Sequence, residues 1–196
     1  LPDFGGLAEL VAVHQDRIFA LPESISFARG AALSIAYGTA IYALKDRASI
    51  VPGETMVVLG ASGGAGLAAV ELGKALGLRV IGAVSSPEKA AAVRLAGAED
   101  VVIYPLGDLD RDASRALASA FKAAAGGEGA NIIYDCVGGP FAEPAIRSLA
   151  WGGRYLTIGF AAGIPSIPLN LTLLKSVEIR GVFYGAFSLR DAARNT

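Results

Sequence analysis

Residues 56–70 read Met56-Val57-Val58-Leu59-Gly60-Ala61-Ser62-Gly63-Gly64-Ala65-Gly66-Leu67-Ala68-Ala69-Val70, and this run carries most of the information about the fold. A short apolar segment, typical of a buried strand, passes through glycines and a serine into a predicted helix, in which Leu72 and Leu76 lie four residues apart on one face. Glycine permits unusual backbone angles, close approach of an anion and tight packing of helix on strand. Free N–H groups at the helix start, with the helix dipole behind them, would donate hydrogen bonds to a pyrophosphate.

The glycine spacing is G-x-x-G-x-x-G and not the standard G-x-G-x-x-G, because Ala61 stands where that pattern has its first glycine. A glycine triplet also occurs in turns that only connect two elements. The strand before it, the helix after it and the surrounding βαβ unit favour a dinucleotide site. The expected cofactor contacts in this turn are Gly60, Ser62, Gly63, Gly64, Ala65 and Gly66.

Strands and helices are expected to alternate along most of the chain. Further strands are predicted at 79–84, 100–104, 131–137, 154–160 and 177–183, and helices at 26–32, 34–48, 87–97, 110–125 and 140–150. This alternation implies an α/β fold with a parallel sheet. Right-handed crossovers then give a doubly wound Rossmann sheet of strand order 3-2-1-4-5-6.

Three segments besides the glycine turn carry a family resemblance: GGLAELVAV at 5–13, AYGTAIYAL at 36–44 and PGET at 52–55. Together they resemble the zinc-independent quinone oxidoreductase (zeta-crystallin-like) branch of the medium-chain dehydrogenase/reductase superfamily. The resemblance covers nearly the whole chain and implies a Rossmann domain at 25–187. It also implies a β remnant of a GroES-like catalytic domain at 1–24, with strands over 5–21, and a truncated C-terminal segment at 188–196. The absence of an initiator methionine fits a chain cut from a longer one.

The end of the second strand bears on the choice of cofactor. It reads Ala83-Val84-Ser85-Ser86, without the carboxylate that NAD enzymes use to bind the ribose hydroxyls. Lys89 could supply positive charge to a 2′-phosphate, and the resemblance implies this role for Lys89 and for Tyr104. The alternatives are a solvated helix lysine and an aromatic cover of the core. NADP(H) is the expected cofactor.

The ends of the later strands should face the same crevice. By resemblance, Cys136, Val137, Gly159 and Phe160 line the nicotinamide half, and Thr39 lies near it. Thr39 could equally be a helix threonine that bonds its own backbone. Cys136 is expected to be a small buried apolar group, because no activating base is evident.

No residue is identified as catalytic, and no metal site is expected. His14 is the only histidine and Cys136 the only cysteine, whereas catalytic zinc needs a larger set of ligands. The acidic run Asp108-x-Asp110-x-Asp112 lacks the glycine and glutamate of a calcium loop and is interpreted as a solvated helix start. Tyr37 and Tyr42 are possible proton donors by type, but core aromatics are the stronger interpretation.

Charge and composition exclude several classes of protein. The formal net charge is −1, which offers no electrostatic footprint for nucleic acid. No apolar segment approaches the ~18 residues of a membrane span, so no membrane partner is expected. A single cysteine allows no internal disulfide and the start is not signal-like. A cytoplasmic protein is therefore expected.

The functional expectation is an NADPH-binding domain of an oxidoreductase that transfers hydride to a quinone or another activated double bond. The alternatives are an enoyl reductase module of a polyketide or fatty-acid synthase, and a dinucleotide-binding fragment with no activity of its own. The isolated chain is expected to be inactive. Residues 177–183 should form an edge strand, which predicts a homodimer through that edge.

Overall fold

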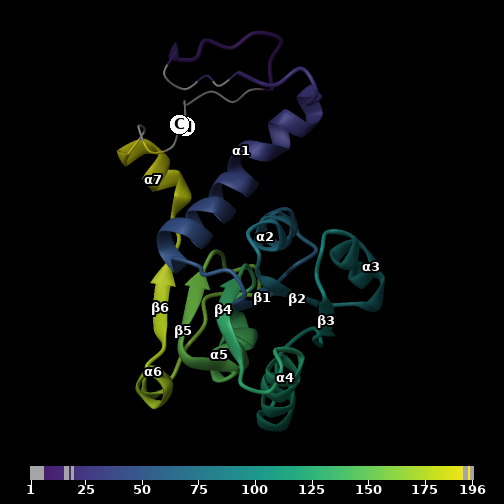
Figure 1. Ribbon diagram of the computed structural model, residues 1–196, viewed down its shortest axis with the longest axis vertical. Coiled ribbons are helices and arrows are strands. Elements are labelled where there is room, and N and C mark those ends of the chain that lie inside the picture. The colour runs from purple at the N-terminus through teal and green to yellow at the C-terminus, as the bar shows by residue number, and fades with distance from the viewer. Residues whose placement is uncertain (1–6, 16–17, 19, 192–193, 195–196) are drawn as a thin grey trace.

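The sheet has the predicted topology. The computed structural model describes residues 7–15, 18, 20–191 and 194 (Figure 1). Within them, six parallel strands are ordered 3-2-1-4-5-6. The strands are β1 Thr55–Leu59, β2 Arg79–Val84, β3 Asp100–Ile103, β4 Ala130–Asp135, β5 Leu149–Thr157 and β6 Glu178–Gly181. The doubly wound α/β fold is thereby confirmed.

Helices cover both faces of the sheet, so its central strands are apolar on both sides. All five residues of β1 are buried, with Met56 and Val58 in one core and Val57 and Leu59 in the other. The first core is covered by α1 Phe27–Ile41, the π-helix η2 Tyr42–Ala48, α2 Gly64–Ala75 and α3 Pro87–Leu95. The second is covered by α4 Arg111–Ala124, the 3-10 turn η3 Gly139–Phe141, α5 Ala142–Arg147 and α6 Asn170–Lys175.

Several predicted boundaries need correction. Ser26 is the N-cap of α1, as expected, and its side chain accepts a hydrogen bond from the Arg29 amide at 3.4 Å. The predicted break after Ala32 is wrong, because no proline or capping glycine stops the helix there and α1 runs on into η2. α6 lies in a region predicted as loop, and α7 Tyr184–Arg190 begins before the predicted start at Ser188.

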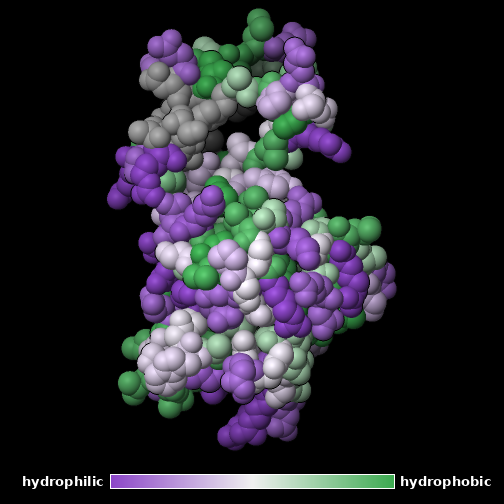
Figure 2. Space-filling view, in the orientation of Figure 1, coloured by the Kyte–Doolittle hydropathy of each residue, from purple (hydrophilic) through white to green (hydrophobic). Residues whose placement is uncertain are grey.

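The strands predicted over 5–21 are not seen. The described residues among 7–24 contain no strand, and the parts of this prediction at 5–6, 16–17 and 19 lie outside the described residues. A strand needs a second strand beside it, and none of the described strands pairs with this segment. Leu7 and Leu10 are almost fully exposed. Figure 2 shows apolar side chains on the surface here and around α6, where Leu173 and Leu174 are exposed. No described helix is long and apolar enough to cross a membrane.

Candidate functional site

A cavity of about 470 Å³ lies at the carboxyl edge of the sheet. Gly60, Ser85, Tyr104 and Cys136 line it, and each directly follows the last residue of β1, β2, β3 or β4. The cavity therefore sits where the strand order reverses between β1 and β4, the usual ligand position in doubly wound sheets. It brings together eight of the residues predicted from sequence: Gly60, Ser62, Gly63, Ser85, Lys89, Tyr104, Cys136 and Val137.

Two glycines of the turn are required by space. Gly60 has φ +72°, and a Cβ there would lie 2.9 Å from Val137 Cγ2. A Cβ on Gly66 would lie 2.2 Å from the carbonyl oxygen of Gly60, so α2 could not pack as close to the turn. No side chain caps α2 at Gly63, which leaves the amides of its first turn available to an anion.

Ser85 and Lys89 form a polar pair at the end of β2. The Lys89 ammonium donates a hydrogen bond to Ser85 Oγ at 2.8 Å. Lys89 lies one turn into α3 and is exposed, whereas Ser85 is half-buried. Both line the same cavity as the glycine turn. A hydroxyl and an ammonium together suit a phosphate group better than a ribose hydroxyl pair.

Tyr104 is both a cavity wall and part of the core. It is 6% exposed and packs against Phe141, with ring centroids 4.8 Å apart. Burial, with smaller contributions from Asp135 and Cys136, raises the pKa of the Tyr104 hydroxyl, so it remains a hydrogen-bond donor. The sequence pattern did not point to Phe141, although Gly138-Gly139-Pro140 after β4 indicates a tight turn that could bring a side chain back.

Cys136 is not an activated nucleophile. Burial and the neighbouring Asp135 raise the pKa of its thiol to about 12. The side chain contacts the apolar core on the α1 and α2 side. Cys136 is half-buried and not fully buried as expected, while its apolar contacts agree with its interpretation as a small apolar group.

Six predicted contacts do not line this cavity: Thr39, Gly64, Ala65, Gly66, Gly159 and Phe160. Thr39 lies in α1 and is half-buried. Gly159 and Phe160 lie against Gly138 in the loop after β4. The next two residues, Ala161 and Ala162, line the cavity. Leu106, Gly107 and Asp108 also line it and were not predicted, because their loop has no regular spacing.

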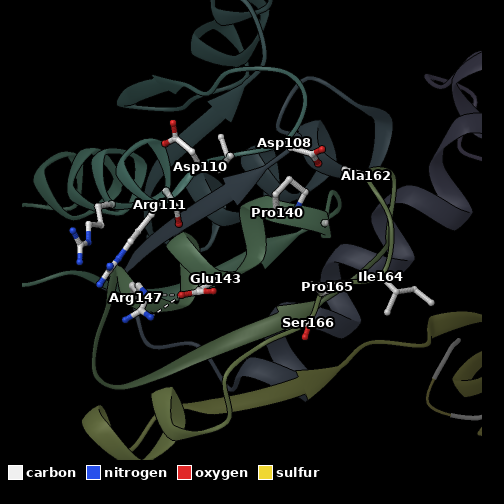
Figure 3. Close-up of a pocket in the computed structure, with 14 residues that line it drawn as sticks. Asp108, Asp110, Arg111, Pro140, Glu143, Arg147, Ala162, Ile164, Pro165 and Ser166 are labelled. Atoms are coloured by element: carbon white, nitrogen blue, oxygen red, sulfur yellow. Dashed lines mark hydrogen bonds and ion pairs between the residues drawn. The ribbon is translucent and has the colours of Figure 1, made fainter.

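A second cavity of about 820 Å³ adjoins the first and shares Asp108, Pro140 and Ala162 with it (Figure 3). Two of its charged groups, Glu143 and Arg147, form an ion pair. Arg147 donates to Glu143 Oε1 at 2.6 and 2.9 Å. Asp110 is the N-cap of α4, which agrees with the interpretation of this acidic run as a helix start. The smaller cavity is the stronger candidate for a cofactor, because the glycine turn and the ends of four strands line it and do not line the larger one.

Zinc does not fit the described part of the chain. No three His, Cys, Asp or Glu side chains among the described residues could together hold a metal ion. His14 and Cys136 come from distant segments, the first from the exposed N-terminal region and the second from the cavity wall.

Comparison with known proteins finds a dehydrogenase family model, quinone oxidoreductase-like proteins and a polyketide synthase component. The family model of zinc-binding dehydrogenases matches residues 64–195. Quinone oxidoreductase-like protein 2 of Bos taurus is 39% identical over 189 residues, which cover 95% of this chain and 52% of that protein. The polyketide synthase component PikAII of Streptomyces venezuelae is 36% identical over 188 residues, 96% of this chain and 5% of that protein.

Similar solved structures also include quinone oxidoreductases. The quinone oxidoreductase from Thermus thermophilus, solved also in complex with NADPH, is similar with a TM-score of 0.79 and 35% identity. The match covers 96% of this chain and 57% of that one. The chain thus spans about half the length of the quinone oxidoreductase-like proteins that it matches.

Proposed function

The chain belongs to the zinc-binding dehydrogenase family, in the quinone oxidoreductase branch of the medium-chain dehydrogenase/reductase superfamily, and we propose that it binds NADPH in the cavity at the carboxyl edge of the sheet. In the whole protein this domain would serve a reductase that transfers hydride to a quinone or another activated double bond without zinc. The proposed division is a catalytic-domain remnant at 1–24, the cofactor domain at 25–187 and the start of a further segment at 188–196.

One observation carries the choice of NADPH. Lys89 and Ser85 are hydrogen-bonded at 2.8 Å in the cavity that the glycine turn also lines, and β2 ends without a carboxylate. NAD enzymes place an acid at this point to accept hydrogen bonds from the ribose. Here the phosphate of NADPH would meet an ammonium, and the ribose of NADH would lose its usual acceptor.

Different residues of the cavity would bind different parts of the cofactor. The turn at 60–66, with Ser62 and the first amides of α2, would bind the pyrophosphate. Ser85, Lys89 and Tyr104 would bind the 2′-phosphate. The nicotinamide half would extend toward Thr39, Cys136, Val137, Gly159 and Phe160, as the family resemblance implies.

When bound, NADPH supplies the hydride. The chain binds and orients the cofactor and shields it from water, since buried residues such as Val137 and Phe141 form part of the cavity wall. A proton would reach the product from a side chain or from water. We assign no catalytic residue in this chain, and we expect it to be inactive without the rest of the protein.

A second candidate function is an enoyl reductase module, supported by the 36% identity to PikAII. The two functions differ in substrate and not in cofactor. Turnover of NADPH by the full-length protein with a naphthoquinone, compared with a crotonyl thioester, distinguishes them. Turnover of neither, with NADPH bound, would favour the third candidate, a domain that only binds the dinucleotide.

The 2′-phosphate assignment has a direct test. Adenosine 2′,5′-bisphosphate and 5′-ADP are titrated separately into the chain. The proposal predicts tighter binding of the 2′,5′-bisphosphate, because Lys89 and Ser85 contact only the 2′-phosphate. Equal binding of the two ligands would contradict the assignment.

A further inference from the structure

We propose that Asp135 is the positioning residue of the cofactor site, because its buried carboxylate holds the loop after β4 in the shape that lines the cavity. The inference rests on the proposed function, since it concerns the site where NADPH would bind. Asp135 is the last residue of β4 and is 1% exposed, and it is absent from the cavity lining. It therefore acts through the loop and not by contact with the cofactor.

Asp135 binds both loops that meet at the site. Its Oδ1 atom accepts hydrogen bonds from the amides of Val137 at 2.6 Å and Gly138 at 2.9 Å. Its main-chain carbonyl accepts from the amides of Ile158 at 2.9 Å and Gly159 at 3.2 Å. One residue thus fixes the loop after β4 and the first residues after β5.

The two loops are packed too closely to move independently. Gly138 and Gly139 have φ +66° and +53°. A Cβ on Gly138 would lie 2.7 Å from the carbonyl oxygen of Gly163, and one on Gly139 would lie 2.4 Å from that of Ala162. Because Val137 and Ala162 both line the cavity, a shift of the first loop would change two of its walls.

Tyr155 in turn holds the carboxylate. Its hydroxyl donates a hydrogen bond to Asp135 Oδ2, and it is 1% exposed on the neighbouring strand β5. Burial and the nearby carboxylate raise the pKa of Tyr155, which keeps its hydroxyl a donor. Without the Asp135 carboxylate, the amides of Val137 and Gly138 would be buried donors without an acceptor, a state that a loop relieves by rearranging.

The test uses Asp135→Ala, Asp135→Asn and Tyr155→Phe, with Ser148→Ala as the control. Ser148 is fully buried and its hydroxyl donates to the Ala145 carbonyl at 2.7 Å, but it does not line the cavity. Two quantities are measured on each folded chain: the hydrogen-exchange rates of the Val137 and Gly138 amides without cofactor, and the dissociation constant for NADPH.

Asp135→Ala should speed exchange of both amides and weaken NADPH binding about tenfold, the effect of losing one or two charge-assisted hydrogen bonds. Asp135→Asn should restore most of the affinity, since its amide oxygen can still accept both loop N–H groups and the Tyr155 hydroxyl can rotate to accept. Tyr155→Phe should weaken binding about threefold, because the carboxylate is then free to rotate. Ser148→Ala should lower stability and leave the NADPH affinity unchanged.

Wild-type exchange rates and wild-type affinity in Tyr155→Phe and in any folded Asp135→Ala would overturn the proposal. If Asp135→Ala does not fold, Tyr155→Phe decides. A purely structural role for Asp135 predicts lower stability in these variants with no change in affinity. If the wild-type chain binds no NADPH, the proposed function fails, and the exchange rates still test the role of Asp135 in the loop.

Discussion

At the residue scale, the proposal that the chain prefers NADPH depends on Lys89. Its ammonium donates a hydrogen bond to Ser85 Oγ in the cavity that the glycine turn also lines. The sequence alone left open whether Lys89 was a solvated helix residue. The structure places it beside Gly60, Ser62 and Gly63 along one cavity, which supports the proposed phosphate role.

Lys89→Glu should weaken NADPH binding by about tenfold or more, because a favourable contact with a phosphate becomes a repulsive one. NADH binding should change little. The control is Lys45→Glu, which makes the same charge change at an exposed residue outside the cavity. Calorimetric titration of both variants measures the effect. Unchanged NADPH affinity in Lys89→Glu would show that Lys89 does not bind the 2′-phosphate.

Cys136 should resist alkylation in the folded chain. Burial and Asp135 raise the pKa of its thiol from 9.0 to about 12, so the thiolate is scarce near neutral pH. Because the folded pKa lies above the unfolded one, this group's contribution to stability is present below about pH 9 and is lost as the pH rises toward 12. Rates of carbamidomethylation, followed by mass spectrometry at about pH 8, compare folded and urea-unfolded chains. Equal rates would contradict the burial of this thiol.

At the element scale, the junction of β1 and α2 depends on Gly66. An added methyl group there would lie 2.2 Å from the Gly60 carbonyl oxygen and 2.8 Å from Ala61 Cα. These are backbone atoms, so relief requires α2 to move away from β1. Gly64 offers a matched comparison in the same turn of helix, since a Cβ there would meet nothing within 4 Å.

Gly66→Ala should therefore lower the free energy of unfolding by about 1–3 kcal/mol, the usual effect of overpacking, and weaken NADPH binding. Gly64→Ala should leave stability unchanged or raise it slightly, since alanine favours helix over glycine. Urea unfolding monitored by circular dichroism measures both. Equal stability of the two variants would show that the close approach at Gly66 is unimportant.

The elements that the sequence predicted most accurately are those bounded by turn residues. β1 and β2 are apolar runs set between turns and were predicted to within a residue. β5 begins at Leu149 and not at Arg154, because Gly152 and Gly153 interrupt its pattern while the chain still pairs with β4. The expected N-terminal strands failed for a different reason, since a strand pattern does not supply the neighbour that a strand needs.

The same distinction holds for the site. Glycine spacing, strand ends and the family resemblance together predicted eight of the residues that line the cavity. Phe141, Ala161 and Ala162 were missed, because their positions depend on how the loop after β4 packs against the loop after β5. That packing is a tertiary contact between segments distant in sequence, and no local pattern encodes it.

At the scale of the whole molecule, the two edges of the sheet are β3 and β6. An edge strand exposes unpaired backbone groups and can pair with a second copy of the chain. The family resemblance implies dimers through the edge that corresponds to β6. We therefore propose a homodimer through 177–183, in which Ile179, 41% exposed, would be covered.

Ile179→Lys should shift the chain from dimer to monomer, because a charged side chain on an edge strand opposes pairing. The control is Ile103→Lys on the opposite edge strand, where Ile103 is 50% exposed; it should leave the dimer intact. Sedimentation velocity over a range of concentrations measures both. A wild-type chain that stays monomeric at high concentration would rule out this interface.

The central claim is that the chain is an NADPH-binding domain, and calorimetric titration with NADPH and, separately, with NADH tests it most directly. We expect tight binding of NADPH and weak binding of NADH, because the glycine turn serves both cofactors whereas Ser85 and Lys89 serve only the 2′-phosphate. Equal affinities would retain the dinucleotide site and reject the phosphate assignment. Binding of neither would contradict the claim, and the turn at 60–66 would then only connect β1 to α2.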